Sequence, residues 1–367
     1  MQQESNEAPS ASEPYQASPL VHAKGRGALS NRNSRFDQHQ VDYEPDEAPP
    51  IAKRSEFFPD ATVRLITRNR SPDIPFDRSI NAYKGCEHGC VYCYARPTHA
   101  YLDLSPGTDF ETKIFYKTNV RERLAQELAS SGYGRVPIKP IALGTNTDPY
   151  QPVEKRLELT RDILQLLLDH RHPVTIVTKG ALIERDLDLL AALARFDLVC
   201  VMLSITTLDN GLKTVMEPRA ASPNKRLQLV EQLAAAKVPV GVMVAPLIPW
   251  VNDMELEAIL ERSAAAGARR AGYVLLRLPG EVKALFGEWL EVHRPERAKH
   301  VLNLMRDSRG GALYDAQWGE RMTGRGPIAK LLKQRFVRAA RKQNLALQAP
   351  PLRCDLFKVP TPQASLF

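Results

Sequence analysis

Short apolar segments alternate with amphipathic segments through the middle of the chain. Six apolar, β-branched runs each have the length of a buried strand, at residues 79–84, 138–143, 173–178, 198–205, 238–244 and 272–278. Segments with helical spacing of apolar residues lie between them, at 120–129, 160–170, 185–195, 224–236 and 254–266. Near-continuous apolar runs are typical of parallel strands that are buried on both faces of a sheet. The alternation therefore predicts an α/β fold.

The number of strand–helix units indicates which α/β fold to expect. Six units are two fewer than a complete eight-unit barrel, so we expect a partial (β/α)6 TIM-like barrel with parallel strands over residues 56–280. Helical spacing continues at 282–292 and 295–306, and it predicts a C-terminal helical extension over 281–347. Residues 1–55 are rich in Gln, Ser, Asn, Pro and charge, which predicts a disordered tail. Residues 348–367 contain several prolines and predict an extended tail.

The composition excludes some classes of protein. Hydrophobic residues make up 43% of the 367 residues, which is enough for an ordinary globular core. No run of 18 apolar residues occurs, so a transmembrane helix is not expected. The N-terminus lacks the basic-then-apolar pattern of a signal peptide, and a cytoplasmic location is therefore the expectation. The net charge of +8 permits a polyanionic partner without requiring one.

Three of the five cysteines fall within eight residues, directly after the first predicted strand: Cys86, Cys90 and Cys93. That position is the carboxyl edge of the sheet, where barrel enzymes place their chemistry. Thiolates suit iron–sulfur clusters or zinc. A structural zinc site takes four protein ligands, whereas three thiolates on a four-iron cluster leave one iron open to a small molecule. The spacing favours a catalytic [4Fe–4S] cluster, and a zinc site completed by His88 or His99 is the alternative.

The same motif carries a resemblance to a known family. The CxxxCxxC spacing, with Tyr92 directly before the third cysteine, resembles the signature of the radical S-adenosylmethionine (SAM) superfamily. The segments TDPYQPVE, VTKG and EPRAASPNKRL resemble the branch that contains spore photoproduct lyase and "DNA repair photolyase"-like proteins. The resemblance implies a [4Fe–4S] cluster whose open iron binds SAM, and reductive cleavage of SAM to a 5′-deoxyadenosyl radical. It also implies a lyase- or oxidoreductase-type enzyme served by an electron donor similar to flavodoxin or ferredoxin.

Polar side chains follow the predicted strands and would line one pocket at their carboxyl ends. The carboxylate of SAM requires a cation, for which Lys179 is a candidate. Its ammonium and ribose hydroxyls require acceptors, and the candidates are Asn146, Asp148 and Ser204.

The resemblance adds roles for particular residues. It implies that Lys179 and Ser204 contact SAM, that Tyr92 packs near the adenine, and that Glu217 and Arg219 order the pocket. The structural alternative is that these residues form turns, helix caps or a buried ion pair that holds the loops together.

The resemblance favours nucleic acid as the substrate, in a repair-like reaction, and so do a basic helix and a terminal peptide near the C-terminus, which are described below. In photoproduct lyases a further cysteine can return hydrogen to the product, but neither Cys200 nor Cys354 lies at a matching position. Two alternatives stay open. One is radical SAM modification of another macromolecule or a small molecule; the other is a non-catalytic nucleic-acid-binding protein with a structural zinc or cluster site.

The C-terminal part of the chain suggests two partners. Basic residues recur from Arg321 to Lys342, and an apolar stripe at helical spacing predicts an amphipathic helix, through Ile328, Leu331, Leu332, Phe336 and Ala339. Its cationic face either meets nucleic-acid phosphates or is simply solvated. The last residues, Gln363–Phe367 (QASLF), resemble the peptide by which bacterial repair proteins bind the sliding clamp.

Overall fold

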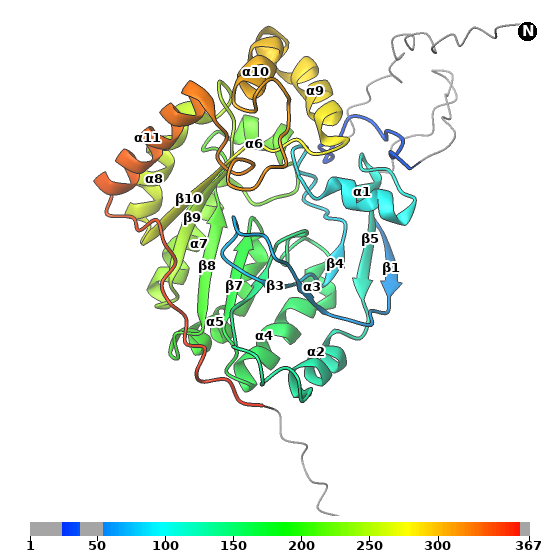
Figure 1. Cartoon of the computed structure of the whole chain (residues 1–367), viewed down its shortest axis with the longest axis vertical. Coiled ribbons are helices and arrows are strands. Elements are labelled where there is room, and N and C mark those ends of the chain that lie inside the picture. The colour runs from blue at the N-terminus through cyan, green and yellow to red at the C-terminus, as the bar shows by residue number, and fades with distance from the viewer. Residues whose placement is uncertain (1–23, 37–53, 360–367) are drawn as a thin grey trace, which may run out of the picture.

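The computed structural model describes residues 24–36 and 54–359. Its main sheet has seven strands in the order β10-β9-β8-β7-β6-β3-β2. Six of these strands run parallel to one another, and the seventh, β2, pairs antiparallel with β3 at the edge of the sheet. The strands are β2 (Ile66–Arg68), β3 (Arg78–Ile80), β6 (Ile141–Leu143), β7 (Val174–Thr178), β8 (Val199–Ser204), β9 (Val240–Leu247) and β10 (Arg270–Leu275). This curved sheet confirms the predicted partial barrel of six parallel strands (Figure 1).

Helices cover the outer face of the main sheet and explain its unbroken apolar strands. Every residue of β8 is buried, as expected for a central parallel strand. The covering helices are α2 (Val120–Ala129), α4 (Leu159–Asp169), α5 (Leu187–Ala194), α7 (Pro223–Ala235) and α8 (Leu256–Ala265). The side chain of Ser222 caps α7 by accepting a hydrogen bond from the Lys225 amide. These bounds lie within a few residues of the predicted helices.

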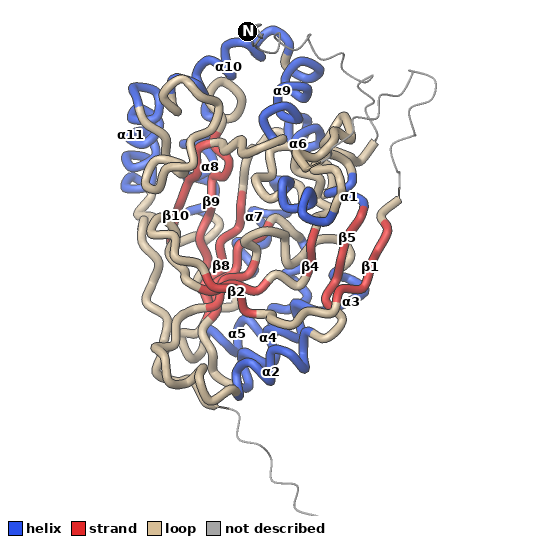
Figure 2. Tube along the Cα trace, turned by 45° about the vertical axis from the view of Figure 1, so that its right-hand side comes forward, coloured by secondary structure: helices blue, strands red, loops and turns tan. Residues whose placement is uncertain are grey.

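A second, three-stranded sheet was not predicted. It contains β1 (Glu56–Asp60), β5 (Lys113–Lys117) and β4 (Tyr83–Lys84), in the order β1-β5-β4. The predicted strand 79–84 is divided between the two sheets, because β3 pairs with β6 whereas β4 pairs with β5. Figure 2 shows the small sheet beside the main one.

Of the C-terminal helices, the first two lie at the carboxyl edge of the main sheet, and the last packs against α8 and β10 at the side of the sheet. The C-terminal helices are α9 (Val282–His293), α10 (Pro295–Asp307) and α11 (Gly326–Lys342), and α6 (Asn210–Met216) lies beneath the first two. Phe286 and Trp289 of α9 share one buried cluster with Tyr92. The Trp289 indole donates a hydrogen bond to the Val215 carbonyl oxygen at 2.9 Å. The helical extension therefore shares a core with the cysteine loop.

The two termini differ in what the structure adds. Residues 24–36 pack against the cysteine loop with Ala28 and Leu29 buried, which differs from the disordered tail expected over residues 1–55. Residues 348–359 form no helix or strand and run past the amino ends of the main strands, where the Arg353 amide donates to the Asp197 carbonyl oxygen. Among the helices in the described ranges, none has the length and apolar character needed to cross a membrane.

Candidate functional site

The three cysteines lie on one loop that leaves β4 and crosses the carboxyl edge of the main sheet. Backbone hydrogen bonds fix the loop from two sides: the Cys86 amide donates to the Phe110 carbonyl oxygen at 2.9 Å, and the Val91 amide to that of Met216 at 3.1 Å. The loop turns at Gly89, whose φ of 66° is a conformation that other residues rarely adopt. The predicted position after the first strand is therefore the observed one.

The environment of the three thiols disfavours their thiolate forms when no metal is bound. Burial raises the pKa of Cys86 and Cys93, and burial together with the charge of Glu217 raises the pKa of Cys90 to about 12. The thiols therefore stay protonated until a metal displaces the protons.

The arrangement of possible ligands favours a cluster over a single ion. Within residues 24–36 and 54–359, no three His, Cys, Asp or Glu side chains converge on one ion site. In a [4Fe–4S] cluster each thiolate binds a different iron, so such convergence is not required. Both histidines of the zinc alternative have other partners: His88 Nδ1 lies 3.3 Å from Asp148 Oδ2, and His99 Nε2 lies 2.9 Å from the Lys113 carbonyl oxygen. The residues present therefore fit a three-thiolate cluster.

A buried triad lies directly beside the cysteine loop. The Tyr92 hydroxyl donates to one oxygen of Glu217, and Arg226 of α7 forms an ion pair with the other. Arg226 also donates to the Ser204 carbonyl oxygen at 2.9 Å, at the end of β8. Burial alone would raise the pKa of Glu217, but the charges of Arg226 and Lys179 lower it to about 2. Glu217 therefore stays ionised next to Cys90, and Arg226 within the triad balances its charge.

Lys179 follows β7 and places a cation at the same site. Its ammonium nitrogen lies 5.8 Å from the centre of the Tyr92 ring, and its charge lowers the pKa of both Glu217 and Cys90. In the part of the chain that the structure describes, it forms no ion pair with a carboxylate. The cation is therefore available to an anionic ligand beside the cysteines.

Asp148 has a different environment from Lys179, because protein groups occupy both of its oxygens. Oδ1 accepts from the Thr178 hydroxyl at 2.6 Å and the Tyr150 amide at 2.9 Å, and Oδ2 accepts from the Lys179 amide at 2.7 Å. Together with His88, these contacts lower the pKa of Asp148 to about 2 against the effect of burial. Asp148 therefore joins the loops after β6 and β7 to the cysteine loop.

The other predicted residues lie around the same edge of the sheet. Asn146 is exposed, and its backbone amide donates a hydrogen bond to Asn81 Oδ1 at 3.0 Å. Ser204 is buried at the end of β8. Arg219 does not pair with Glu217; it forms an ion pair with Glu87 at 2.8 Å, and its amide donates to the His88 carbonyl oxygen. Arg219 therefore holds the cysteine loop from one side.

Two further residues, Tyr94 and Arg277, border the site, and Tyr94 was not expected from the sequence. Tyr94 directly follows Cys93, is 43% exposed, and donates its hydroxyl to the Thr145 carbonyl oxygen. The guanidinium of Arg277, which follows β10, lies 4.7 Å from the centre of the Tyr94 ring. The contact joins loops from opposite ends of the main sheet across the mouth of the partial barrel.

Residues 24–36, here called the strap, hold the cysteine loop from its other side. The amides of Gly27 and Ala28 donate to the two oxygens of Glu111, a fully buried residue that pairs with Arg96. Arg96 in turn donates to the Cys90 carbonyl oxygen at 2.9 Å. A Cβ atom on Gly27 would collide with the Gly89 carbonyl oxygen, so only glycine allows this approach.

The strap also reaches the C-terminal helices. The Ser30 hydroxyl donates to Glu288 of α9 at 2.7 Å, and Arg32 forms an ion pair with the same carboxylate. Arg35 lies 3.4 Å from Glu281. The strap therefore connects the cysteine loop to α9, and the only sign of it in the sequence is Arg26 between two glycines.

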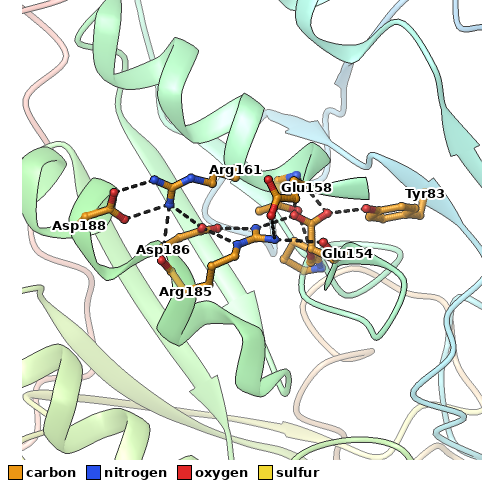
Figure 3. Close-up of polar contacts among 9 residues, drawn as sticks. Tyr83, Glu154, Glu158, Arg161, Arg185, Asp186 and Asp188 are labelled. Atoms are coloured by element: carbon orange, nitrogen blue, oxygen red, sulfur yellow. Dashed lines mark hydrogen bonds and ion pairs between the residues drawn. The ribbon is translucent and has the colours of Figure 1, made fainter. Parts of the chain in front are cut away.

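A second triad lies below the cysteine loop. Tyr83 donates its hydroxyl to Glu154, and Arg185 pairs with the same carboxylate at 2.8 Å (Figure 3). Arg185 also forms ion pairs with Asp186 at 2.8 Å and Glu158 at 3.8 Å, so its positive charge is divided among three carboxylates. Burial raises the pKa of Glu154. The TDPYQPVE segment thus supports the fold beneath the site.

Comparisons with known proteins show the family of the chain. A model of the radical SAM superfamily matches residues 80–262. The uncharacterized protein Rv2578c of Mycobacterium tuberculosis is 40% identical over 235 residues, which cover 64% of this chain and 68% of the relative. The uncharacterized protein MJ0683 of Methanocaldococcus jannaschii is 29% identical over 176 residues, or 48% of this chain and 62% of the relative. The chain belongs to the radical SAM superfamily.

Solved structures of spore photoproduct lyase share the fold. One, a variant with dinucleoside spore photoproduct, is 18% identical, with a TM-score of 0.55 and coverage of 80% of this chain and 81% of that chain. Another, with bound AdoMet and the same dinucleoside, is 16% identical, with a TM-score of 0.56 and coverage of 83% and 88%. Membership of the superfamily implies a [4Fe–4S] cluster and SAM, which the three cysteines and Lys179 fit.

Proposed function

We propose that the protein is an enzyme that cleaves SAM reductively and uses the resulting radical on nucleic acid. Cys86, Cys90 and Cys93 would hold the [4Fe–4S] cluster. When bound, the cluster supplies the electron that cleaves SAM to methionine and a 5′-deoxyadenosyl radical. A flavodoxin- or ferredoxin-like protein would deliver that electron in the cell.

The observation that carries the proposal is the unpaired cation of Lys179 beside the cysteine loop. A carboxylate paired with this ammonium would place SAM next to the open iron. Glu217 and Arg226 would keep the Tyr92 ring in place below the ligand, since both are buried and bonded. Residues of helices α6 and α9 pack with Tyr92 in one buried cluster beside the site.

The primary test is anaerobic reconstitution with iron and sulfide, followed by reduction, addition of SAM and assay for 5′-deoxyadenosine. We expect cluster absorbance and 5′-deoxyadenosine from the wild-type protein, and neither from Cys90→Ala. Cys200→Ala is the matched control, because Cys200 is buried near the amino end of β8. Retained zinc without cluster absorbance or product would reject the proposal.

Lys179 can be tested separately from the cluster. We expect Lys179→Met to keep the cluster but to weaken SAM binding at least about tenfold, since a hydrogen bond to a charged group contributes roughly 1.5–3 kcal/mol. Lys225→Met is the control, because Lys225 pairs with Glu184 at 2.7 Å on a neighbouring helix. Equal SAM affinity in both variants would exclude Lys179 as a ligand.

Nucleic acid is the proposed substrate class for two reasons: the chain is basic, and spore photoproduct lyase structures of the same fold contain a dinucleoside photoproduct. The reaction would differ from repair with a cysteine hydrogen donor. Cys200 is the second residue of β8. Cys354 follows Arg353, whose backbone amide donates a hydrogen bond to the carbonyl oxygen of Asp197, a residue that lies just before β8. Both cysteines therefore lie near the amino ends of the strands, away from the site.

Isotope transfer tests the substrate class directly. Protein turned over with deuterated DNA or RNA should incorporate deuterium into 5′-deoxyadenosine, because the radical abstracts a hydrogen atom from its substrate. Deuterated protein extract and small-molecule extract serve as parallel samples. If deuterium enters 5′-deoxyadenosine only from one of these two extracts, the substrate belongs to that class of molecule and is not nucleic acid.

The sliding clamp is a proposed partner through Gln363–Phe367, which lies outside the described residues. Deletion of these five residues should abolish binding to purified clamp while leaving SAM cleavage unchanged. Equal clamp binding by the shortened protein would reject this partner.

A further inference from the structure

Helix α11 presents two different faces. Leu332, Phe336 and Ala340 are buried against α8 and β10, and the Phe336 ring lies 4.7 Å from that of Tyr273. Leu331, which the sequence places in the apolar stripe, is 49% exposed. The buried stripe is thus narrower than predicted, and more of the helix circumference faces solvent.

The cations of α11 divide between these faces. Arg335 turns inward and pairs with Asp253 at 3.1 Å and Glu257 at 2.8 Å. Four outward-facing cations border one another on the helix, Lys330, Lys333, Arg338 and Arg341, and Lys342 at the end of the helix is exposed as well. Within the described ranges none of the four pairs with a carboxylate. The sequence contains no Asp or Glu from 321 to 354, so the chain leaves this outer face uncompensated.

The four outward cations form one continuous array. They border a shallow open groove together with Gln334 and Val337. From Lys330 to Arg341 the array extends about 16 Å along the helix, at about 1.5 Å per residue. Double-stranded DNA carries one negative charge per roughly 1.7 Å of its axis, so an array of this length can face several phosphates.

We propose that the outer face of α11 is a docking surface for the phosphate backbone of a nucleic acid. The inference rests on the proposed substrate class and adds where that substrate is held. Helix α11 lies at the β10 edge of the main sheet, on the opposite side from the small sheet β1-β5-β4 (Figure 1). Bound nucleic acid would approach the site around the β10 edge.

The apolar side of α11 argues against an anionic membrane as the partner. A helix that lies on a membrane inserts an apolar face between the lipids. The apolar face of α11 is already packed inside the protein through Leu332, Phe336 and Ala340. Among the large apolar side chains of α11, only Leu331 is highly exposed. Nucleic acid needs only the cations, which are the groups that the outer face presents.

The test uses the full chain and two matched variants. The outer variant combines Lys330→Gln, Lys333→Gln, Arg338→Gln and Arg341→Gln, and the inner variant is Arg335→Gln. Binding of a fluorescent 20-base-pair duplex and a 20-nucleotide single strand is measured by anisotropy from 50 to 300 mM KCl. Circular dichroism and SAM cleavage without substrate show whether each variant is folded.

We expect the outer variant to bind at least tenfold more weakly at 50 mM KCl. Each phosphate contact contributes about 0.9 to the slope of log Kobs against log salt for duplex and about 0.7 for single strand, so the slope should fall by up to about 3.6 or 2.8. The inner variant should keep the wild-type slope, because Arg335 is neutralised by Asp253 and Glu257.

Three outcomes would overturn the proposal. An outer variant with wild-type affinity and slope rejects the surface; if that variant still modifies nucleic acid, the proposed function stands. Loss of binding to phosphatidylserine vesicles without loss of duplex binding assigns the face to a membrane. If no protein binds nucleic acid while all cleave SAM, the substrate class itself is rejected.

Discussion

Two buried carboxylates, Glu217 and Glu154, each bind a tyrosine hydroxyl and an arginine, yet their pKa values shift in opposite directions. The pKa of Glu217 falls to about 2, whereas burial raises that of Glu154. The difference lies in the arginines. Among the described residues, Arg226 is 1% exposed and pairs with no carboxylate other than Glu217, whereas Arg185 is 22% exposed and is shared among three carboxylates.

The comparison shows that a motif of three residues does not determine the charge at its centre. Lys179 adds a second cation to the Glu217 triad, on the side of the cysteines. The Glu154 triad instead belongs to the chain of Arg161, Asp186 and Asp188 in Figure 3, which ends at the surface. One triad holds a fixed charge at the site, and the other ties the helices below it together.

The largest expected difference between the two triads is in the free energy of unfolding that is lost when the arginine of each triad is removed. Arg226→Met should lower the free energy of unfolding by roughly 3–5 kcal/mol, because it leaves a buried charge without its partner. Arg185→Met should cost less, since Glu154 keeps its hydrogen bonds from Tyr83 and the Thr160 amide and can take up a proton. Urea unfolding of both variants without metal measures the two losses. Equal losses would contradict the assigned difference in charge.

The second difference is in pH dependence. The folded pKa of Glu217 lies below its ordinary value of 4.5, so its contribution to stability is complete above pH 4.5 and is lost as the pH falls towards 2, a change of roughly 3 kcal/mol. The folded pKa of Glu154 lies above 4.5, so its contribution falls as the pH rises through that range.

Unfolding of wild type, Glu217→Gln and Glu154→Gln from pH 3 to pH 8 measures both trends. The advantage of wild type over Glu217→Gln should shrink below pH 4.5, and its advantage over Glu154→Gln should shrink above it. Slopes of the same sign would remove the distinction between the two triads.

The smallest stability effect concerns the tyrosines. Tyr92→Phe and Tyr83→Phe each remove one hydrogen bond to a carboxylate and should each cost roughly 1–2 kcal/mol. Only Tyr92→Phe should also alter SAM cleavage, because Tyr92 lies beside Lys179 and the cysteines. A similar change in SAM cleavage from Tyr83→Phe would place both triads in the site.

Much of the fold could be predicted because its signals are local. Unbroken apolar runs mark the central strands, and β8 is buried along its whole length. The small sheet had no such signal: β1 contains Pro59, β5 begins and ends with lysine, and the two strands pair across more than 50 residues. Leu331 was assigned to the buried stripe because helical spacing alone does not define how wide the contact with α8 is.

The site could be predicted where its residues share one motif or follow a predicted strand. The three cysteines share one loop, and Lys179 follows a recognisable strand. Arg226 lies inside a helix and Glu111 inside a four-residue helical turn, and nothing near them indicates partners far away in the chain. The strap was missed because its contacts with the cysteine loop and Glu111 use backbone amides and the absence of a side chain at Gly27, which composition does not reveal.

The strap is held at two points, Glu111 and Glu288, and the distance between them in the chain sets the order in which the two contacts can form. The contact of Gly27 and Ala28 with Glu111 can form once residue 111 has been made, but Ser30 contacts Glu288, 258 positions further along the chain than Ser30 itself. The cysteine loop is made before Glu111, and therefore before either contact can form. The second anchor can therefore form only after most of the polypeptide has been made, and until then the nascent chain has the strap attached at one end alone.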